Sequence, residues 1–358
     1  SVTGVQTCAL PIYAPDRIGV VVAGDIEPAA AERLVRQMFS GLKPHKTRRR
    51  EYPVPPHADT RVAVATDPEA QASTVSVLHK RPLQRSSNIG DYRKGLVRAL
   101  FESMLNARFA EIARRPDTPF LGASVGDGTL GRDVEAFGAS ARVNQGGIPR
   151  GVEALETELA RVRQFGFGEA ELERQKKSIL ASYERAYNER DKSETPGYAS
   201  ELVGLFLSGE PTPGIEAEFA LAKRFVPTVT VQETAALARE LVTETNRVVL
   251  AVAPEKKDAV PPTEAMLRDA LRAGASATVT AWVDSASGTM LMSALPKPGT
   301  VKARREIAAI GVTVLTLSNG VEVWLKPTNF KNDQVIFTGY AKGGTADRKS
   351  TRLNSSHT

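Results

Sequence analysis

Histidines are the side chains from which a metal or acid–base site would most readily be built, and the chain has four: His45, His57, His79 and His357. The zinc motifs H-E-x-x-H and H-x-x-E-H need two histidines one helical turn apart with a glutamate between them. None of the four has a second histidine at that spacing. We therefore expect each to be a partly exposed, titrating side chain and not a metal ligand or catalytic base.

Three glycines in VGDGTLGRD, at Gly126, Gly128 and Gly131, match the letters of the dinucleotide fingerprint G-x-G-x-x-G. That fingerprint needs a helix that opens at its third glycine, because the helix N-terminus holds the pyrophosphate. The residues after Gly131 alternate as in a strand, so we assign the glycines to a hairpin turn. The overlapping G-A-S-V-G at 122–126 matches a serine nucleophile elbow in letters only, since no helix follows it.

Carboxylates and tyrosines gather on one long helical segment. We expect Glu169, Glu171 and Glu173 to face solvent. Tyr183 and Tyr187 lie one turn apart, and we expect them to pack in the core or against another domain. These residues do not form a complete active site. The sequence therefore predicts no catalytic, metal-binding or cofactor-binding residue in this chain.

The composition is that of an ordinary soluble globular protein, with 41% hydrophobic and 25% charged residues among 358. The net charge of +6 is dispersed apart from KTRRR at 46–50. We interpret this cluster as a solvated connector, and we expect no nucleic-acid partner. Cys8 is the single cysteine, so no disulfide can form within the chain. No apolar run reaches the roughly 18 residues of a membrane span, and the opening residues lack the pattern of a signal peptide.

Strand and helix patterns alternate irregularly along the chain. We expect strands at 17–23, 61–66, 71–80 and 246–254, a hairpin at 120–143, and helices at 28–41, 91–114, 151–166, 169–192 and 229–242. A last group of strands surrounds the turn Ser318-Asn319-Gly320 and includes QVIFTGYA at 334–341. The irregular order predicts an α+β fold in which an antiparallel sheet packs under helices, and not a parallel Rossmann sheet.

Three parts of the sequence resemble the insulinase/pitrilysin family of zinc metallopeptidases, in the bacterial branch whose chains carry four homologous α+β modules. RIGVVVAGDIEP, which begins at Arg17, resembles the end of the catalytic module. Similarity to the second module is found in three stretches: ELERQKKSILASYERAYNERDKSE, GLFLSGEPTPGIEAEF and NRVVLAVAPEK. Similarity to the beginning of the third module is found in LSNGVEVWLKPTNFKNDQVIFTGYAKGGTA.

In that family, zinc is held by the two histidines of H-x-x-E-H and a more distant glutamate, and the motif glutamate activates the metal-bound water. All of these precede the segment that RIGVVVAGDIEP resembles. The resemblance therefore implies zinc in a parent protein, with none bound by this chain. It also implies peptide or protein substrates, a periplasmic or envelope location, and partners in the missing catalytic module and the second half of the same chain.

The resemblance assigns this chain a non-catalytic role, as a wall of the substrate chamber in an internal fragment of the peptidase that is inactive alone. The alternative is a non-enzymatic scaffold or partner subunit of the same fold. The expected organisation is 13–42 as the end of the catalytic module, 43–59 as a linker, 60–254 as the second module, 255–310 as a linker and 311–346 as the start of a third module.

The two ends of the chain are related at the codon level. Residues 2–12 can be encoded by eleven codons whose reverse complement translates as residues 347–357. No pressure on a protein would produce such a match. We therefore expect residues 1–12 and 347–358 to derive from a sequencing adapter, in which case Cys8 and His357 carry no functional information.

Overall fold

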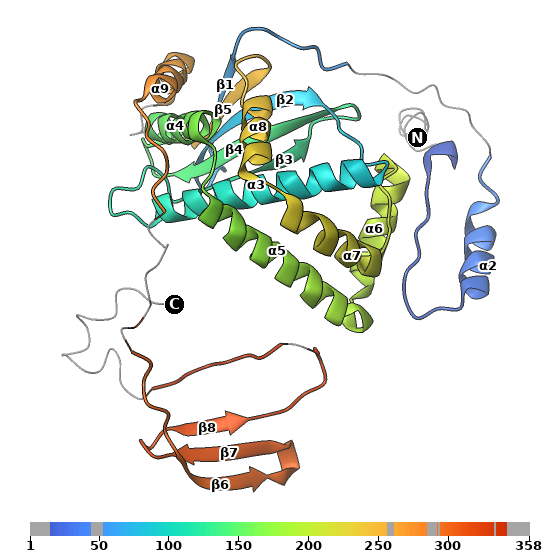
Figure 1. Ribbon diagram of the computed structural model, residues 1–358. Coiled ribbons are helices and arrows are strands. Elements are labelled where there is room, and N and C mark those ends of the chain that lie inside the picture. Colours follow the sequence, from blue (N-terminus) through green and yellow to red (C-terminus); the bar gives the residue numbers. More distant parts are fainter. Residues whose placement is uncertain are drawn as a thin grey trace. The chain divides into compact units, whose positions relative to one another are not determined.

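The computed structural model describes residues 15–43, 53–255, 261–284, 292, 294–332 and 334–341. It divides the chain into two compact units, one holding residues 1–187 and 193–295 and the other holding 188–192 and 296–358 (Figure 1). Cys8, His45, His357, the basic cluster at 46–50 and the two terminal segments lie outside the described residues. The predictions made for them, and for the domain boundaries, stay predictions.

A five-stranded sheet in the order β1-β5-β2-β4-β3 forms the centre of the first unit. Its strands are β1 (Arg61–Asp67), β2 (Ser73–Pro82), β3 (Gly122–Thr129), β4 (Val134–Val143) and β5 (Arg247–Pro254). The pairs β2–β4, β2–β5 and β3–β4 are antiparallel, whereas β1 runs parallel to β5. A parallel pair needs a long crossover, and all the strands and helices between residues 68 and 246 lie between these two strands in the sequence. The expected α+β class is confirmed, with this parallel edge pair added.

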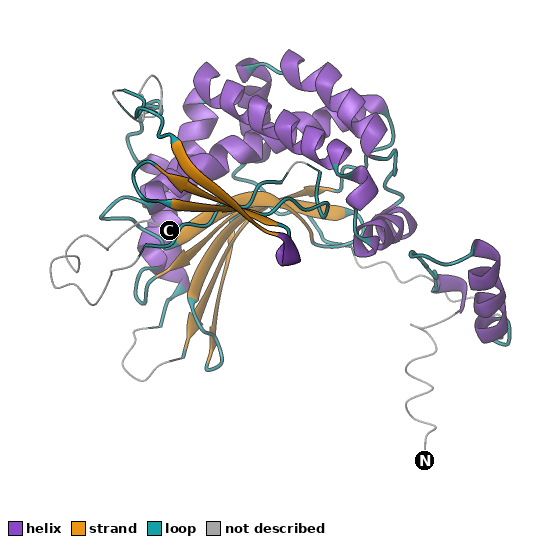
Figure 2. Cartoon of the chain, turned by 90° about the horizontal axis from the view of Figure 1, so that it is seen from below, coloured by secondary structure: helices purple, strands orange, loops and turns teal. Residues whose placement is uncertain are grey.

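Eight α-helices are described: α2 (Pro28–Phe39), α3 (Ile89–Ala113), α4 (Ile148–Phe165), α5 (Glu169–Asn188), α6 (Thr195–Ser208), α7 (Ile215–Phe225), α8 (Val231–Leu241) and α9 (Glu264–Ser276). Helices α3, α4 and α8 lie over one face of the sheet (Figures 1 and 2). Apolar residues recur at helical spacing on α3 and alternate along β2, and together they bury a single core. That core includes Val75, Val77, Leu100, Phe101, Phe109, Leu155 and Leu159.

The opposite face of the sheet, here called the open face, carries mostly short side chains. On β2 and β4 it presents Ser76 and Ser140, whose hydroxyls lie 2.8 Å apart. On β5 it presents Val248, Leu250 and Val252, which alternate with the buried Val249 and Ala251. One face of the sheet is therefore covered by helices, and the side chains on the other face are half-exposed.

Two predicted strands do not form. Residues 18–23 are extended, but no strand pairs with them in the described part of the chain, and Ile18, Val20 and Val22 are exposed. QVIFTGYA is likewise not a strand over 334–341, and Phe337 and Tyr340 are exposed. Both segments have the composition of a strand. A strand also needs a neighbour, because its backbone hydrogen bonds are made between strands.

The segment 255–310, expected to be a linker, contains regular structure. Helix α9 lies within it and packs on α4. Its Leu267 and Leu271 are buried in the core. Strand β6 (Val301–Ile307) also falls inside this segment. The flanking prolines obscured a 13-residue amphipathic helix that begins at the N-cap Thr263.

The glycines of the fingerprint match do not all lie in a turn. Gly126 and Gly128 are in β3, opposite Gly138 and Ala136 of β4, and only Gly131 is in the connection between these strands. The assignment of all three to a turn was wrong, because a glycine can also lie within a strand, although it has no side chain to pack there.

The outer edge of β3 is partly closed by a side chain. The amide of Asn106, on α3, accepts a hydrogen bond from the Val125 backbone N–H (2.7 Å) and donates one to the Val125 carbonyl (3.1 Å). Asn106 therefore occupies the donor and acceptor that another strand would use at this position.

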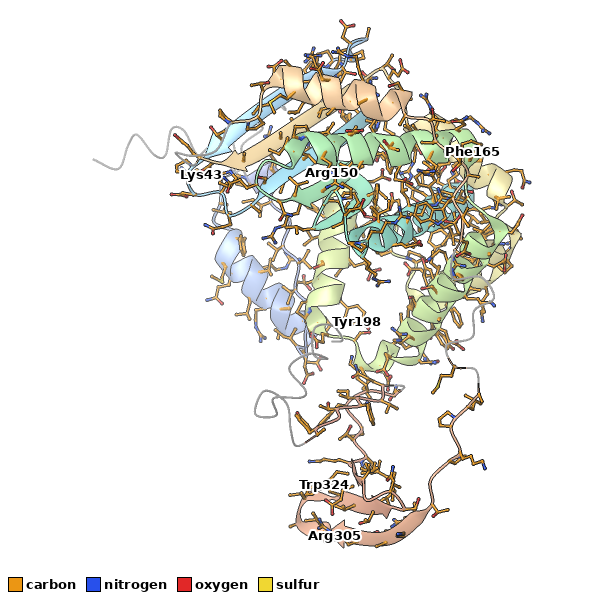
Figure 3. The ribbon with its side chains drawn as sticks, turned by 90° about the vertical axis from the view of Figure 1, so that its left-hand side faces the viewer. Lys43, Arg150, Phe165, Tyr198, Arg305 and Trp324 are labelled. Carbon is orange, nitrogen blue, oxygen red and sulfur yellow. The ribbon has the colours of Figure 1, made fainter. Side chains whose placement is uncertain are left out.

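The second unit contains a three-stranded antiparallel sheet in the order β6-β7-β8. The predicted hairpin is β7 (Val312–Leu317) and β8 (Glu322–Leu325). Gly320 in its turn has φ +86°, a conformation that favours glycine. The guanidinium of Arg305 lies 5.5 Å from the centre of the Trp324 ring, both labelled in Figure 3. Across all the described residues, no helix combines the length and apolar character that crossing a membrane requires.

Candidate functional site

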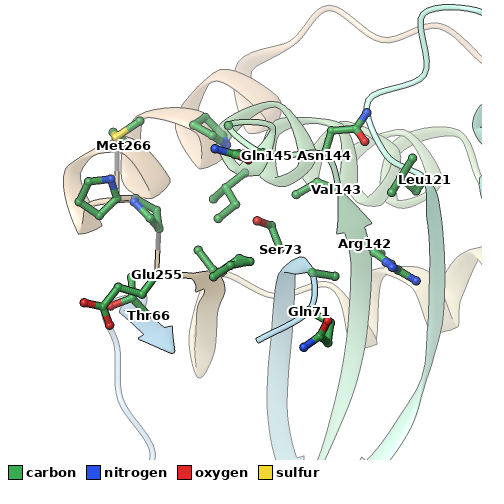
Figure 4. Close-up of a pocket in the computed structure, with 18 residues that line it drawn as sticks. Thr66, Gln71, Ser73, Leu121, Arg142, Val143, Asn144, Gln145, Glu255 and Met266 are labelled. Atoms are coloured by element: carbon green, nitrogen blue, oxygen red, sulfur yellow. The ribbon is translucent and has the colours of Figure 1, made fainter. Parts of the chain in front are cut away.

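A cavity of about 420 Å³ opens at one end of the five-stranded sheet (Figure 4). It lies where β1, β4 and β5 end and β2 begins, and the starts of α4 and α9 complete its wall. Val143, Ile148 and Met266 supply apolar surface. Arg142 and Glu255 lie on opposite sides of it in Figure 4.

The cavity combines apolar surface with a small number of polar groups. Its polar groups are hydroxyls and amides, such as those of Ser73, Gln71 and Asn144, with one guanidinium and one carboxylate. No histidine or cysteine is among the residues that line it. Ser73 therefore has no imidazole to activate it as a nucleophile. The cavity can hold an apolar group flanked by polar ones.

A group of charged side chains, the sheet-end cluster, joins α3 to three strands. It consists of Arg81, Arg98, Glu102, Asp127 and Glu135. Arg81 donates to an Asp127 oxygen and to a Glu135 oxygen, each at 2.6 Å. Arg98 on α3 lies 2.8 Å from the second Asp127 oxygen. Because these pairs are largely buried, they fix the position of α3 on the sheet more firmly than exposed pairs would.

Glu102 is the member of this cluster whose charge is least favoured. Its burial, together with the nearby Asp127 carboxylate, raises the pKa of Glu102 to about 7. Burial also raises the pKa of Asp127, against the opposing effect of Arg81. With Glu102 protonated, the two arginines balance the two remaining carboxylates. Its ionisation leaves the cluster with one excess negative charge.

Replacing Glu102 by glutamine is expected to stabilise the protein at pH 8 and to have little effect at pH 4. The folded protein keeps the Glu102 proton up to pH 7, whereas the unfolded chain releases it near the ordinary value of 4.5. The wild type therefore loses stability as the pH rises through this range, and Glu102→Gln does not. Urea unfolding of both proteins at several pH values measures the difference. An equal difference at pH 4 and pH 8 would contradict it.

A second buried ion pair lies between α3 and α5. Nε and Nη2 of Arg108 each donate to an oxygen of Glu171 at 2.8 Å, and Nη2 also donates to the Gly166 carbonyl at 3.0 Å. The guanidinium carbon lies 4.5 Å from the centre of the Phe167 ring and 5.3 Å from that of Trp282. The Arg108 side chain is 2% exposed. The prediction that Glu171 faces solvent was therefore wrong.

The two described histidines do not form a site. His79 is buried in β2, stacks on Phe137 and has its Nδ1 2.9 Å from the Thr243 carbonyl. Burial, assisted by Arg247, lowers the pKa of His79 to about 4. It is therefore neutral near pH 7, and the prediction of a partly exposed, titrating side chain was wrong for it. His57 is half-buried in the segment before β1, where its backbone N–H donates to the Asn246 side chain.

The tyrosines pack as predicted. The Tyr183 hydroxyl lies 3.1 Å from that of Tyr92 on α3, and the Tyr187 ring lies 5.3 Å from the Phe219 ring on α7.

Within the described ranges, no group of three or more histidine, cysteine, aspartate or glutamate side chains is arranged to hold a metal ion.

Comparison with known proteins finds one matching family model and several relatives. Residues 5–179 match the Peptidase M16 inactive domain. The match begins in the segment expected to be adapter-derived, so the bounds of that segment stay a prediction. This match and the relatives named below confirm the resemblance to the insulinase/pitrilysin family of peptidases that the sequence predicted.

Among its relatives are proteases of the PqqL type. The chain is 29% identical over 296 residues to the "Zinc protease PQQL-like" of Arabidopsis thaliana, a match covering 83% of this chain and 28% of that protein. The crystal structure of the periplasmic protease PqqL from Escherichia coli matches with a TM-score of 0.63 and 20% identity, over 85% of this chain and 34% of that one.

A further solved structure, of the ferredoxin protease FusC with Arabidopsis ferredoxin, has a TM-score of 0.56 and 20% identity over 84% of this chain and 34% of that one. At these identities the solved structures establish the shared fold alone. The chain spans about a third or less of each of these three relatives.

Proposed function

We propose that this chain is a non-catalytic part of a zinc metalloendopeptidase that hydrolyses peptides or small proteins. The observation that supports it most directly is the match of residues 5–179 to the inactive domain of the M16 peptidases. The names of the relatives as zinc proteases support the reaction and the cofactor of the parent protein. The name of PqqL as a periplasmic protease supports a periplasmic or envelope location.

Within that enzyme, the chain forms a wall of the substrate chamber. The open face supports this role, because the short side chains of Ser76 on β2 and Ser140 on β4 leave room for an extended polypeptide to lie close to the sheet. The cavity lined by Val143, Ile148 and Met266 could receive an apolar side chain of such a polypeptide. The catalytic residues and zinc ligands of the parent belong to a module outside this chain.

The first experiment assays the 358-residue chain with a fluorescence-quenched peptide in the presence of zinc. We expect no hydrolysis that a chelator abolishes, because the described side chains provide no metal-ligand group. Chelator-sensitive cleavage by the purified chain would refute this assignment.

The second experiment extends the gene by roughly 200 codons in the 5′ direction, about one domain's length. An H-x-x-E-H motif there distinguishes a peptidase from a non-enzymatic scaffold or partner subunit of the same fold. Its absence would favour the scaffold and contradict the proposed enzyme.

A further inference from the structure

The open face of the five-stranded sheet carries three basic side chains, whereas the described strands bring one carboxylate to it. Side chains alternate along a strand, and those directed to this face include Arg61, Lys80 and Arg142. The carboxylate is that of Asp67 at the end of β1, which accepts a hydrogen bond from the Glu69 backbone N–H (2.7 Å). The open face therefore has an excess of positive charge.

Arg142 lies among hydroxyl groups. Its neighbour on β2 is Thr74. Beside this pair, a row of serines crosses three strands, in which Ser76 of β2 and Ser124 of β3 both pair in register with Ser140 of β4. The Arg142 guanidinium is exposed and makes no ion pair or hydrogen bond with the described residues. A free guanidinium beside hydroxyl donors is a setting in which a carboxylate can be bound.

Arg61 and Lys80 form a second cationic position on the same face, one on each side of β5. Arg61 pairs in register with Val248 of β5, and the Lys80 backbone N–H donates to the Asn246 carbonyl. Burial, together with the charge of Arg61, lowers the pKa of Lys80. Lys80 donates to the Pro55 carbonyl at 3.1 Å, and neither basic side chain has a carboxylate partner in the described part of the chain. A bound anion would relieve the repulsion between these two charges.

Short side chains separate the two cationic positions. Thr74, beside Arg142, and Lys80 lie six residues apart on β2, a distance of about 20 Å in a strand. The row of serines lies between them, and a Cβ added to Gly126 or Gly128 of β3 would meet nothing within 4 Å. An extended polypeptide segment can therefore lie over this surface and reach both positions.

We propose that the open face binds acidic polypeptide segments, with one substrate carboxylate held by Arg142 and the hydroxyls around it and another held by Arg61 and Lys80. Charge complementarity of this kind favours negatively charged partners over neutral and basic ones. The proposal rests on the proposed function, because it names the class of substrate that the chamber wall receives. These substrates are polypeptides with aspartate or glutamate residues about six positions apart.

Binding of fluorescent peptides to the 358-residue chain, measured by anisotropy at low ionic strength, tests the proposal. The probe is an otherwise uncharged peptide of about twelve residues with blocked termini and two glutamates about six positions apart. Its matched control has glutamine at both positions. The chain variants are Arg142→Gln and Arg61→Gln. The control variant is Arg239→Gln on α8, because Arg239 is exposed and has no partner among the described residues but lies in the helical layer.

We expect the glutamate peptide to bind about five- to tenfold more tightly than the glutamine peptide. Arg142→Gln and Arg61→Gln should each weaken its binding about two- to fivefold, whereas Arg239→Gln should leave it unchanged. Added salt should reduce these differences, because the charges are exposed.

Equal binding of the two peptides would overturn the proposal. An equal loss in Arg239→Gln would assign the effect to the net charge of the chain and would also overturn it. A single-stranded oligonucleotide of the same charge is a third probe. If it binds more tightly than the glutamate peptide and Arg142→Gln abolishes the difference, the partner is a nucleic acid and the proposal is wrong.

Zinc content and hydrolysis of the same two peptides, measured on the longer product of the extended gene, separate this proposal from the proposed function. Chelator-sensitive hydrolysis that does not distinguish the two peptides overturns the acidic specificity and leaves the function standing. Charge-selective binding by the short chain, together with a longer protein that has neither zinc nor hydrolysis, supports the acidic specificity and contradicts the function.

Discussion

Replacing Arg108 by methionine is expected to lower the free energy of unfolding by about 3–5 kcal/mol. Methionine preserves most of the side-chain volume but leaves the Glu171 carboxylate buried without its two hydrogen bonds from the guanidinium. The Gly166 carbonyl loses its donor at the same time. Urea unfolding followed by circular dichroism measures the effect.

The matched control is Arg36→Met in α2. Arg36 also pairs with a carboxylate, at 2.7 Å from Glu32, but the two side chains are 76% and 62% exposed. An exposed pair at this helical spacing contributes only about 0.3–0.5 kcal/mol. The double variant Arg108→Met with Glu171→Leu should be more stable than Arg108→Met alone, because it removes the unpaired charge. Equal losses for Arg108→Met and Arg36→Met would contradict the prediction.

Replacing Gly274 by alanine is expected to destabilise the protein by about 1–3 kcal/mol, the usual cost of overpacking. Gly274 lies on α9 against α4, where an added Cβ would come within 2.5 Å of the Glu153 carbonyl oxygen and 2.8 Å of Glu156 Cβ. The first of these atoms belongs to the α4 backbone, so the helices must move apart. Urea unfolding reports the loss, and hydrogen exchange of the α9 amides shows whether that helix is the part released.

Gly95 provides the same substitution without the contact. It lies inside α3, and an added Cβ would meet nothing within 4 Å. Gly95→Ala should therefore stabilise the protein by about 0.5–1 kcal/mol, because alanine loses less backbone freedom in a helix than glycine does. A gain at both positions would show that α9 does not pack on α4 at the distance seen here.

The sequence was sufficient to predict most elements of the first unit. Alternation identified β2, and helical spacing identified α3, because each buries one face against a single core. The sequence was insufficient where packing against a distant segment decides whether a helix or strand forms. Residues 18–23 have the composition of a strand, but no strand in the described part of the chain pairs with them. Helix α9 is ordered by its packing on α4 despite the prolines around it.

The polar groups were the hardest to predict, since burial depends on neighbours distant in sequence. Glu171 has the helical setting of a surface charge, and its burial follows from Arg108, which is 63 residues away. His79 continues the period-two pattern of Val75 and Val77, and that pattern is the signal that could have identified it as buried. The family was recognisable from long stretches of sequence although no catalytic motif is present.

The Asn106 amide, by closing one position of the β3 edge, has a consequence for biosynthesis. A sheet edge that is open while a chain is still folding can pair with the wrong strand. An edge strand with two glycines in its second half offers few side chains to prevent such an error. By binding the Val125 backbone from a helix adjacent in sequence, Asn106 can occupy that position before later parts of the polypeptide emerge, and so protects the edge from pairing with a wrong strand.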